Sequence, residues 1–252
     1  MVEAPPGGRR KPWADALAPY ADRIVSCRGA ACDMDWKDVQ LLGGRWTVRM
    51  PAAAILLAGG GSTRMGTDKA LLPLDGKPML GQIYEQVRPW FRRIVVSSNN
   101  AAAHGALGAP VLPDEVPDQG PLRGIVSALK AVPEELCFVT ACDVPVVDID
   151  LVRSLIRQAG DYDGVPIAQD RDGGPDAVVP YSGRPEPLHA VYRRRVLPVF
   201  EQCLASGRYR MTEALNRCRV KYVPVAPDRI RNLNTMDEYR RYLGRADDVD
   251  PR

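Results

Sequence analysis

The chain has little of what marks several functional classes. Its 252 residues include only two histidines, His104 and His189, too few for a histidine-based metal site without other ligands. Six cysteines in a chain of this length lack the density of a disulfide scaffold. We expect all six to be reduced thiols that pack as small apolar side chains.

Long apolar runs and a charge excess are also missing. No segment approaches the roughly 20 apolar residues that a transmembrane helix needs, and the start, MVEAPPGGRRKPW, lacks the apolar core of a signal peptide. Lysine plus arginine is 34 and aspartate plus glutamate is 31, a net charge of +3 without the concentrated basic face of nucleic-acid binders. We therefore expect a cytoplasmic protein that binds neither membrane nor nucleic acid.

The composition changes near residue 50. Residues 1–50 hold three of the four tryptophans and two cysteines behind a Pro/Gly-rich start, with a short helix expected over 14–24. We interpret them as an extension of unknown role, partly disordered, or as a start assigned too early, with Met50 as the alternative. The regular pattern of 51–243 predicts one domain, and 244–252 reads as a flexible tail.

Strands and helices alternate from residue 52 onward. Short apolar runs predict buried strands at 52–58, 93–97, 111–112 and 136–141, and apolar spacing predicts helices at 79–91, 121–131 and 150–159. This alternation is typical of an α/β protein with a mostly parallel sheet covered on both faces.

The second half has a different pattern. Segments 176–181 and 187–192 flank SGRPE and predict a hairpin or a pair of edge strands, a small antiparallel element. Helices are expected at 196–205 and 211–217, and a strand at 220–225. The sequence Thr235-Met-Asp-Glu238 is a capping box that opens a final helix through Leu243.

A glycine-rich loop, Leu57-Ala-Gly-Gly-Gly-Ser-Thr-Arg-Met-Gly66, follows the first strand. Such a loop lets backbone N–H groups surround an anion. It matches neither a P-loop, which needs Lys-Ser/Thr after Gly66, nor the dinucleotide G-x-G-x-x-G pattern, which Arg64 interrupts. Two cations, Arg64 and Lys69, accompany the loop and suit a triphosphate. The alternative is a tight strand-to-helix turn with solvated charges.

The whole string, Leu-Ala-Gly-Gly-x-Ser-x-Arg-Met-Gly-x-Asp-Lys, resembles the motif of the nucleotidyltransferase superfamily with a GT-A-like fold, and within it the molybdenum cofactor guanylyltransferase family. Further family landmarks follow in order at 71–78, 113–124, 141–145, 187–192 and 232–235. The resemblance covers about residues 52–243. It implies a three-layer, Rossmann-like fold in which nucleotides bind at the carboxyl ends of the strands.

The resemblance also implies roles for individual residues. Asp143 would hold Mg²⁺, and Lys69 and Arg64 would contact the phosphates as catalytic cations. The nucleotide-binding residues implied are Leu57, Ala58, Gly59, Gly60, Lys69, Asn99, Asp114 and Asp143. Each side chain has a structural alternative: a helix N-cap for Asp143, a solvated lysine or arginine for Lys69 and Arg64, a turn aspartate for Asp114, and a loop asparagine for Asn99.

The second substrate would meet Arg64, Gly120, Asn232 and Asn234, although the two asparagines could instead form a turn before Thr235. Gly120, Leu122 and Gly124 would let the backbone approach the nucleotide or pterin. Arg123 stands where the family most often has a small residue, and this changes the local packing unless the arginine simply points outwards. His189 lies in an apolar stretch, and we expect a packed, hydrogen-bonded histidine rather than a catalytic base.

The function implied is transfer of GMP from GTP to molybdenum-bound molybdopterin, with Mg²⁺ as cofactor and pyrophosphate as the leaving group. Transient contact with molybdopterin-delivering or acceptor molybdoenzymes is expected. The alternatives are a molybdopterin cytidylyltransferase, another nucleotidyltransferase such as one acting on sugar phosphates, and a non-catalytic protein that delivers the cofactor.

Overall fold

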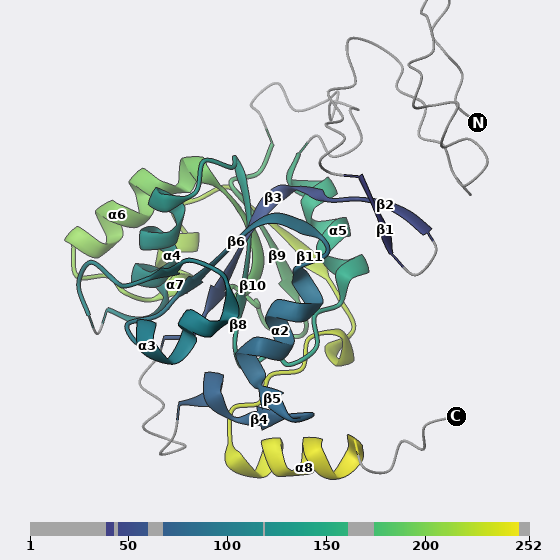
Figure 1. The fold of residues 1–252 in the computed structure, drawn as a ribbon. Helices are drawn as coiled ribbons and strands as arrows, with labels where there is room; N and C mark the ends of the chain where they lie inside the picture. Colours follow the sequence, from purple (N-terminus) through teal and green to yellow (C-terminus); the bar gives the residue numbers. More distant parts are fainter. Residues whose placement is uncertain (1–38, 43–44, 60–67, 118, 161–173, 247–252) are drawn as a thin grey trace, which may run out of the picture.

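The computed structural model describes residues 39–42, 45–59, 68–117, 119–160 and 174–246. The helix expected over 14–24 lies outside these residues. The described part has one seven-stranded sheet with helices on both faces (Figure 1). Within it, no helix reaches the length and apolarity that crossing a bilayer requires.

The central sheet has the strand order β11-β9-β10-β8-β3-β6-β7. Its strands are β3 (Met50–Leu57), β6 (Phe91–Ser97), β7 (Val111–Leu112), β8 (Leu136–Ala141), β9 (Ala177–Tyr181), β10 (His189–Arg193) and β11 (Val220–Pro224). β3 pairs in parallel with β6 and β8, and β6 pairs in parallel with β7. Only β10 runs against its two neighbours. The predicted fold, a mostly parallel sheet with a small antiparallel element, is confirmed.

The pair formed by the 176–181 and 187–192 segments does not lie at the edge of the sheet. β9 and β10 are antiparallel partners, but β10 also pairs with β8 and β9 also pairs with β11. Both strands are buried along most of their length. Of the two alternatives, the antiparallel pair is confirmed. The position at the edge was wrong, because β11, which comes later in the chain, pairs with β9.

Alternate residues of β3 point to opposite faces of the sheet, as the two-residue period of a strand requires. Ala54 and Leu56 pack in one core cluster with α2 (Met79–Val87), α5 (Ile149–Ala159) and α8 (Met236–Ala246). The other β3 face packs in a second cluster, whose helices are α4 (Gly120–Ala131), α6 (Leu197–Ala205) and α7 (Met211–Leu215). These two clusters make the three-layer architecture.

Two helices have different bounds from those expected. α2 ends at Val87 and Phe91 already belongs to β6, because Pro89 has no N–H with which to continue the helical hydrogen bonds. α8 continues to Ala246, beyond the predicted end at Leu243. Its start is as predicted: Glu238 N donates to Thr235 Oγ1 (3.2 Å) and Thr235 N donates to Glu238 Oε2 (3.0 Å).

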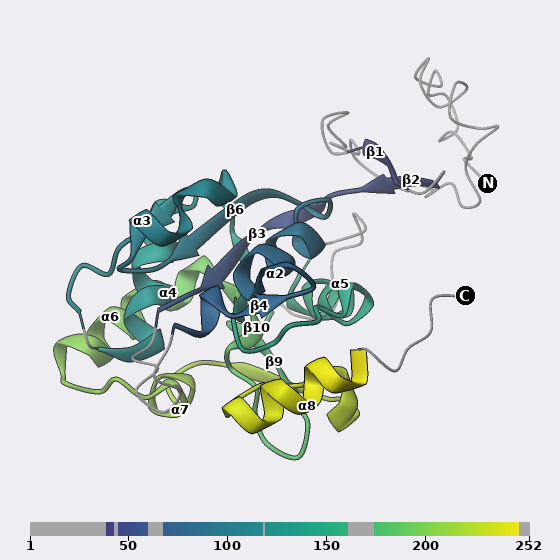
Figure 2. The same ribbon diagram turned by 60° about the horizontal axis from the view of Figure 1, so that its bottom comes forward.

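Short elements complete the described residues. They are β1 (Val39–Leu42), β2 (Arg45–Val48), β4 (Pro73–Leu74), β5 (Lys77–Pro78), α3 (Ala101–His104), and the 3₁₀ turns η3 (Lys69–Leu71), η4 (Gly105–Leu107), η5 (Arg194–Val196) and η6 (Pro227–Arg229). β1 and β2 form an antiparallel hairpin that stands apart from the main sheet, beyond the amino end of β3 (Figure 2). The sequence pattern did not predict this hairpin.

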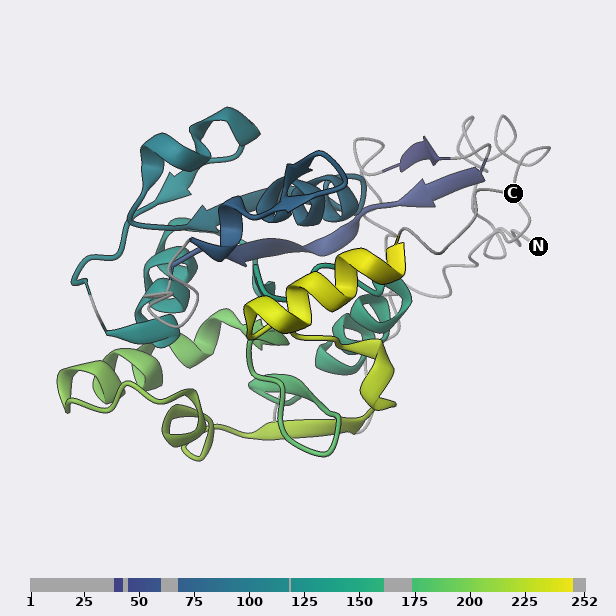
Figure 3. The ribbon, with the colours of Figure 1, turned by 90° about the horizontal axis from the view of Figure 1, so that it is seen from below.

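α8 lies across the molecule near β4 and β5 (Figure 3). Tyr239, which is buried, donates its hydroxyl to the Pro73 carbonyl oxygen. This contact joins the last helix to the segment that directly follows Lys69. Of the four described cysteines, all are free thiols, and burial raises the pKa of Cys137 and Cys142 to about 12. The expectation of reduced thiols packed as apolar side chains is met at Cys137 and Cys203, which are buried.

Candidate active site

Four parallel strands end at one edge of the sheet, in the order β8-β3-β6-β7. The predicted nucleotide-binding residues follow these ends: Leu57, Ala58 and Gly59 at β3, Asn99 after β6, Asp114 after β7 and Asp143 after β8. Backbone bonds tie the strand ends together, from Ala58 N to Ser97 O (2.9 Å) and from Cys142 N to Leu57 O (3.0 Å). The fold therefore brings these predicted residues to one edge, where ligands bind in open α/β sheets.

Asn99 and Asp114 form a reciprocal pair. Asn99 Nδ2 donates to Asp114 Oδ2 (3.1 Å), and Asp114 N donates to Asn99 Oδ1 (2.8 Å). Asp114 Oδ1 is buried and has no hydrogen-bond partner among the described residues. Burial raises the pKa of Asp114 above its ordinary value, while the bond from Asn99 and the charge of Arg123 oppose that shift. The pair thus offers a carboxylate oxygen that still needs a donor.

The helix beside this pair approaches it closely at Gly124. A Cβ at Gly124 would lie 2.4 Å from Ser97 Oγ and 3.5 Å from Asp114 Oδ1. Ser97 is buried at the end of β6. Gly124 therefore lets α4 pack closely against the β6 end and Asp114, and the approach of its backbone to a substrate stays a prediction. Gly120, at the start of the same helix, adopts a φ of +70°, which favours glycine.

Arg123 does not simply point outwards. Its Nε and Nη2 donate to Gln119 Oε1 (2.8 and 2.6 Å), and its Nη1 donates to Glu115 Oε2 (3.1 Å). Glu115 follows Asp114 and Gln119 precedes Gly120, so one guanidinium joins both ends of the loop between β7 and α4. The loop that carries Asp114 is consequently attached to the helix.

Lys69 and Asp143 meet at the backbone of Leu233. Lys69 Nζ donates to Leu233 O (3.2 Å), and Leu233 N donates to Asp143 O (2.7 Å). Leu233 is itself buried. The lysine after the glycine loop and the aspartate after β8 therefore converge on the segment that carries Asn232 and Asn234.

The Asp143 carboxyl is half-buried. Burial is the largest cause that raises its pKa; the Lys69 charge opposes the rise, and the nearby Glu186 charge adds to it. Asp143 does not cap the next helix, because the N-cap of α5 is Asp148, whose Oδ1 accepts from Leu151 N (2.9 Å). The structure thus removes the N-cap alternative for Asp143.

The chemistry around Asp143 fits a divalent cation that keeps most of its ligands from substrate and water. Mg²⁺ is bound by one or two protein carboxylates together with substrate phosphates, so it needs no cluster of protein ligands. No group of three or more His, Cys, Asp or Glu side chains suited to a metal occurs within the described ranges. Asp143, next to Lys69 at a strand end, is the residue that would hold such an ion.

Of the remaining predicted residues, Asn232 and Asn234 are described by the structure, whereas Arg64 and Gly60 are not. Asn232 Nδ2 donates to Glu186 Oε2 (3.3 Å), and Asn234 N donates to Glu238 Oε2 (2.7 Å) within the α8 cap. Arg64 and Gly60 lie outside the described residues, so their predicted contacts stay predictions. Glu186, from the loop between β9 and β10, is a carboxylate that sequence reasoning missed.

His189 is packed and bonded, as expected. Its Nδ1 lies 3.0 Å from Thr140 Oγ1, and its ring meets Phe138 edge-on with 5.1 Å between centroids. Burial lowers the pKa of His189 to about 4. A neutral imidazole buried between strands is a structural residue.

Comparison with known proteins agrees with this geometry. Residues 54–220 match the family described as the MobA-like NTP transferase domain. A probable molybdenum cofactor guanylyltransferase of Carboxydothermus hydrogenoformans is 31% identical over 75% of this chain and 93% of its own length. The molybdenum cofactor guanylyltransferase of Pseudomonas putida is 34% identical over 73% of this chain and 94% of its own length.

A solved structure shares the fold. The molybdopterin-guanine dinucleotide biosynthesis protein A of Archaeoglobus fulgidus superposes with a TM-score of 0.62 at 24% identity, covering 78% of this chain and all of that one. The family match spans more than half of this chain and includes the β3, β6, β7 and β8 strand ends. The chain therefore belongs to the MobA-like NTP transferase family and is a nucleotidyltransferase.

Proposed function

We propose that this enzyme transfers GMP from GTP to molybdenum-bound molybdopterin, forming the guanine dinucleotide cofactor and pyrophosphate. The observation that carries the nucleotide choice is the Asn99–Asp114 pair, with Asp114 Oδ1 buried and without a partner among the described residues. Guanine presents two adjacent donors, its ring N–H and its exocyclic amine, and a carboxylate can accept from both. The names of the relatives support the same choice.

The reaction needs no protein nucleophile. The phosphate of molybdopterin is already an anion and attacks the α-phosphorus of GTP in line, breaking the bond to pyrophosphate. Asp143 would hold Mg²⁺, which, when bound, neutralises charge on the phosphates. Lys69 adds a fixed positive charge beside Asp143, and Arg64 with the loop amides would add more. Asn232 and Asn234 would contact the pterin.

The proposal is tested by pyrophosphate release with GTP or CTP, each with and without molybdopterin, in Mg²⁺ or in a chelator. We expect release only with GTP, molybdopterin and Mg²⁺ together. Faster release with CTP would overturn the nucleotide choice and favour the cytidylyltransferase. Tight GTP binding without release would favour a non-catalytic delivery protein.

The role of Asp143 is tested with matched variants. Asp143→Asn should reduce Mg²⁺-dependent release by about 10²–10³-fold, the loss typical of one group that stabilises transition-state charge. Asp150→Asn, an exposed carboxylate in the first turn of α5, is the control. Because burial raises the pKa of Asp143, the neutral side chain should leave the free protein at least as stable. Unchanged turnover in Asp143→Asn would contradict the metal assignment.

A further inference from the structure

Glu186 is a buried carboxylate that the proposed chemistry does not use. Only 8% of the residue is exposed. Ser182 Oγ (2.8 Å) and Arg184 Nε (3.1 Å) donate to its Oε1, and Asn232 Nδ2 (3.3 Å) donates to its Oε2. A buried carboxylate is unfavourable unless donors surround it, so the three bonds define where this side chain must lie.

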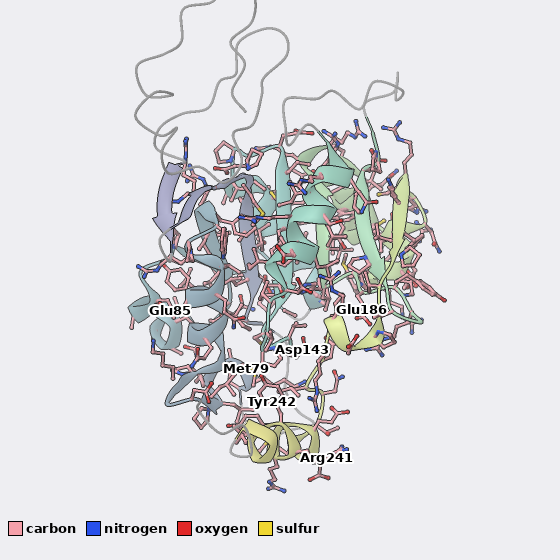
Figure 4. All side chains as sticks on the ribbon, turned by 90° about the vertical axis from the view of Figure 1, so that its right-hand side faces the viewer. Met79, Glu85, Asp143, Glu186, Arg241 and Tyr242 are labelled. Atoms are coloured by element: carbon pink, nitrogen blue, oxygen red, sulfur yellow. The ribbon has the colours of Figure 1, made fainter. Side chains whose placement is uncertain are left out.

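The backbone on either side of Glu186 is also held in place. Glu186 N donates to Pro180 O at the end of β9 (2.9 Å), and His189 N at the start of β10 donates to Glu186 O (3.1 Å). The backbone of Glu186 is therefore attached to two interior strands of the sheet. Figure 4 labels Glu186 and Asp143, which lie toward the same end of the sheet, on the side of α8.

Asn232 belongs to a distant part of the sequence that crosses this edge. The next residue, Leu233, bonds to the Asp143 carbonyl and to Lys69. Glu186 thus adds a side-chain contact immediately before the point at which the segment meets Asp143 and Lys69. The backbone of this segment is held by Asp143, whereas the Asn232 side chain donates to Glu186.

The identity of this partner determines the orientation of the amide. A carboxylate only accepts hydrogen bonds, so the NH₂ end of Asn232 must face Glu186 and the carbonyl oxygen must face away. A serine in place of Glu186 would permit either orientation. The Glu186–Asn232 bond therefore leaves the carbonyl oxygen of Asn232, which is an acceptor, to face a ligand.

We propose that Glu186 is a positioning residue for the second substrate: it fixes Asn232 so that the amide oxygen accepts from the donor edge of a pterin. A pterin carries a ring N–H beside an exocyclic amine, and both donate. The identity of the substrate rests on the proposed function. The geometry of the Glu186–Asn232 bond does not depend on that function. The proposed function and the role of Glu186 can therefore fail separately.

Kinetics provide the first test. With GTP saturating, Glu186→Ala should raise the KM for molybdopterin about tenfold, the effect of one lost hydrogen bond to a charged partner. The KM for GTP and kcat should change by no more than about twofold, since the phosphate-binding residues are untouched. Ser182→Ala is the matched control, because it removes a donor to Glu186 and leaves the bond to Asn232.

The conservative variant separates positioning from general stability. In Glu186→Gln the side-chain oxygen should stay with the donors Ser182 Oγ and Arg184 Nε, so its NH₂ faces Asn232 and turns that amide over. The folded variant should therefore keep the raised KM for molybdopterin expected in Glu186→Ala. An equal rise in both KM values, or an unchanged KM for molybdopterin in folded Glu186→Ala, would overturn the inference.

A second test needs no substrate. In ¹⁵N-labelled protein, the side-chain amide resonances of Asn232, identified by their absence in Asn232→Asp, should shift in Glu186→Ala and stay in place in Ser182→Ala. Unshifted resonances in Glu186→Ala would contradict the orienting bond. If the wild-type enzyme released no pyrophosphate with GTP and molybdopterin, the proposed function would fail, and this measurement would still decide the role of Glu186.

Discussion

At the scale of single residues, Gly124 shows a steric requirement at the site. Gly124→Ala should lower the free energy of unfolding by about 1–3 kcal/mol, the usual effect of overpacking, because its Cβ would lie 2.4 Å from Ser97 Oγ. Moving α4 to relieve this clash should also displace the loop that Arg123 attaches to α4 and that carries Asp114, so the affinity for GTP should fall. Urea unfolding and GTP titration measure the two effects.

Two variants control for the glycine substitution itself. Gly105→Ala lies at a position with an ordinary negative φ and nothing within 4 Å of the added Cβ, so it should be neutral or slightly stabilising. Ser97→Ala in the Gly124→Ala background removes the clashing hydroxyl and should restore part of the loss. A Gly124→Ala protein as stable as the wild type would contradict the close approach of α4.

His189 should make stability depend on pH in a defined window. Its pKa is about 4 in the folded protein against 6.5 when exposed, so the unfolded chain binds the extra proton first as pH falls. Stability is therefore full above about pH 6.5 and declines toward pH 4, by about 3 kcal/mol from this group. His189→Asn should flatten that decline in urea midpoints measured from pH 7 to 4. An equally steep decline in the variant would show that other groups cause it.

At the scale of elements, the loop between β7 and α4 depends on Arg123. The side chain is only 12% exposed and bonds to both Gln119 and Glu115, whereas Lys130 bonds to Glu115 from a position that is 36% exposed. Arg123→Ala should raise the KM for GTP by about tenfold, because the loop that carries Asp114 loses its attachment to the helix. Lys130→Ala should change it by no more than about twofold, since exposed ion pairs contribute little.

Arg123→Lys distinguishes geometry from charge. Lysine keeps the positive charge near Asp114 but cannot bond to Gln119 and Glu115 with one planar group. We expect its KM for GTP to stay closer to that of Arg123→Ala than to the wild type. Recovery to the wild-type KM would mean that charge alone matters here.

At the scale of the whole molecule, the family match and the site both begin after the first 50 residues. Residues 54–220 carry the match, and every described site residue lies at Leu57 or later. We propose that residues 51–243 suffice for catalysis. The structure adds that Met50 is a buried residue of β3, with its N–H bonded to Trp90 O (2.8 Å), and that α8 extends to Ala246.

A chain that begins at Val39 should therefore keep kcat/KM within about twofold of the full chain. It retains the hairpin and the complete β3. A chain that begins at Met50 places a charged amino group at a buried strand end, and it should unfold at lower temperature while keeping the same kinetics when folded. Loss of turnover in the Val39 chain would assign a catalytic role to the residues before it.

The sequence by itself determined the local features of this protein. Apolar runs predicted β3, β6, β7 and β8, since buried parallel strands are continuously apolar. The Thr235–Glu238 cap could be predicted because its hydrogen bonds join residues only three positions apart. The positions of Asp114 and Asp143 at strand ends followed from the alternation of strands and helices along the sequence. The helix was extended too far past Val87 because helical spacing continued through the Pro89 turn.

Only the tertiary structure decided which distant residues meet. No local pattern relates Glu186 to Asn232, Lys69 to Leu233, or Arg123 to Glu115 across its loop, because these contacts depend on how separate elements pack. The same reason explains β9 and β10, which resemble edge strands until β11 returns to pair with β9. Residue type and spacing determine which functional groups this enzyme has. The packing of elements far apart in the chain determines which residues hold those groups in position.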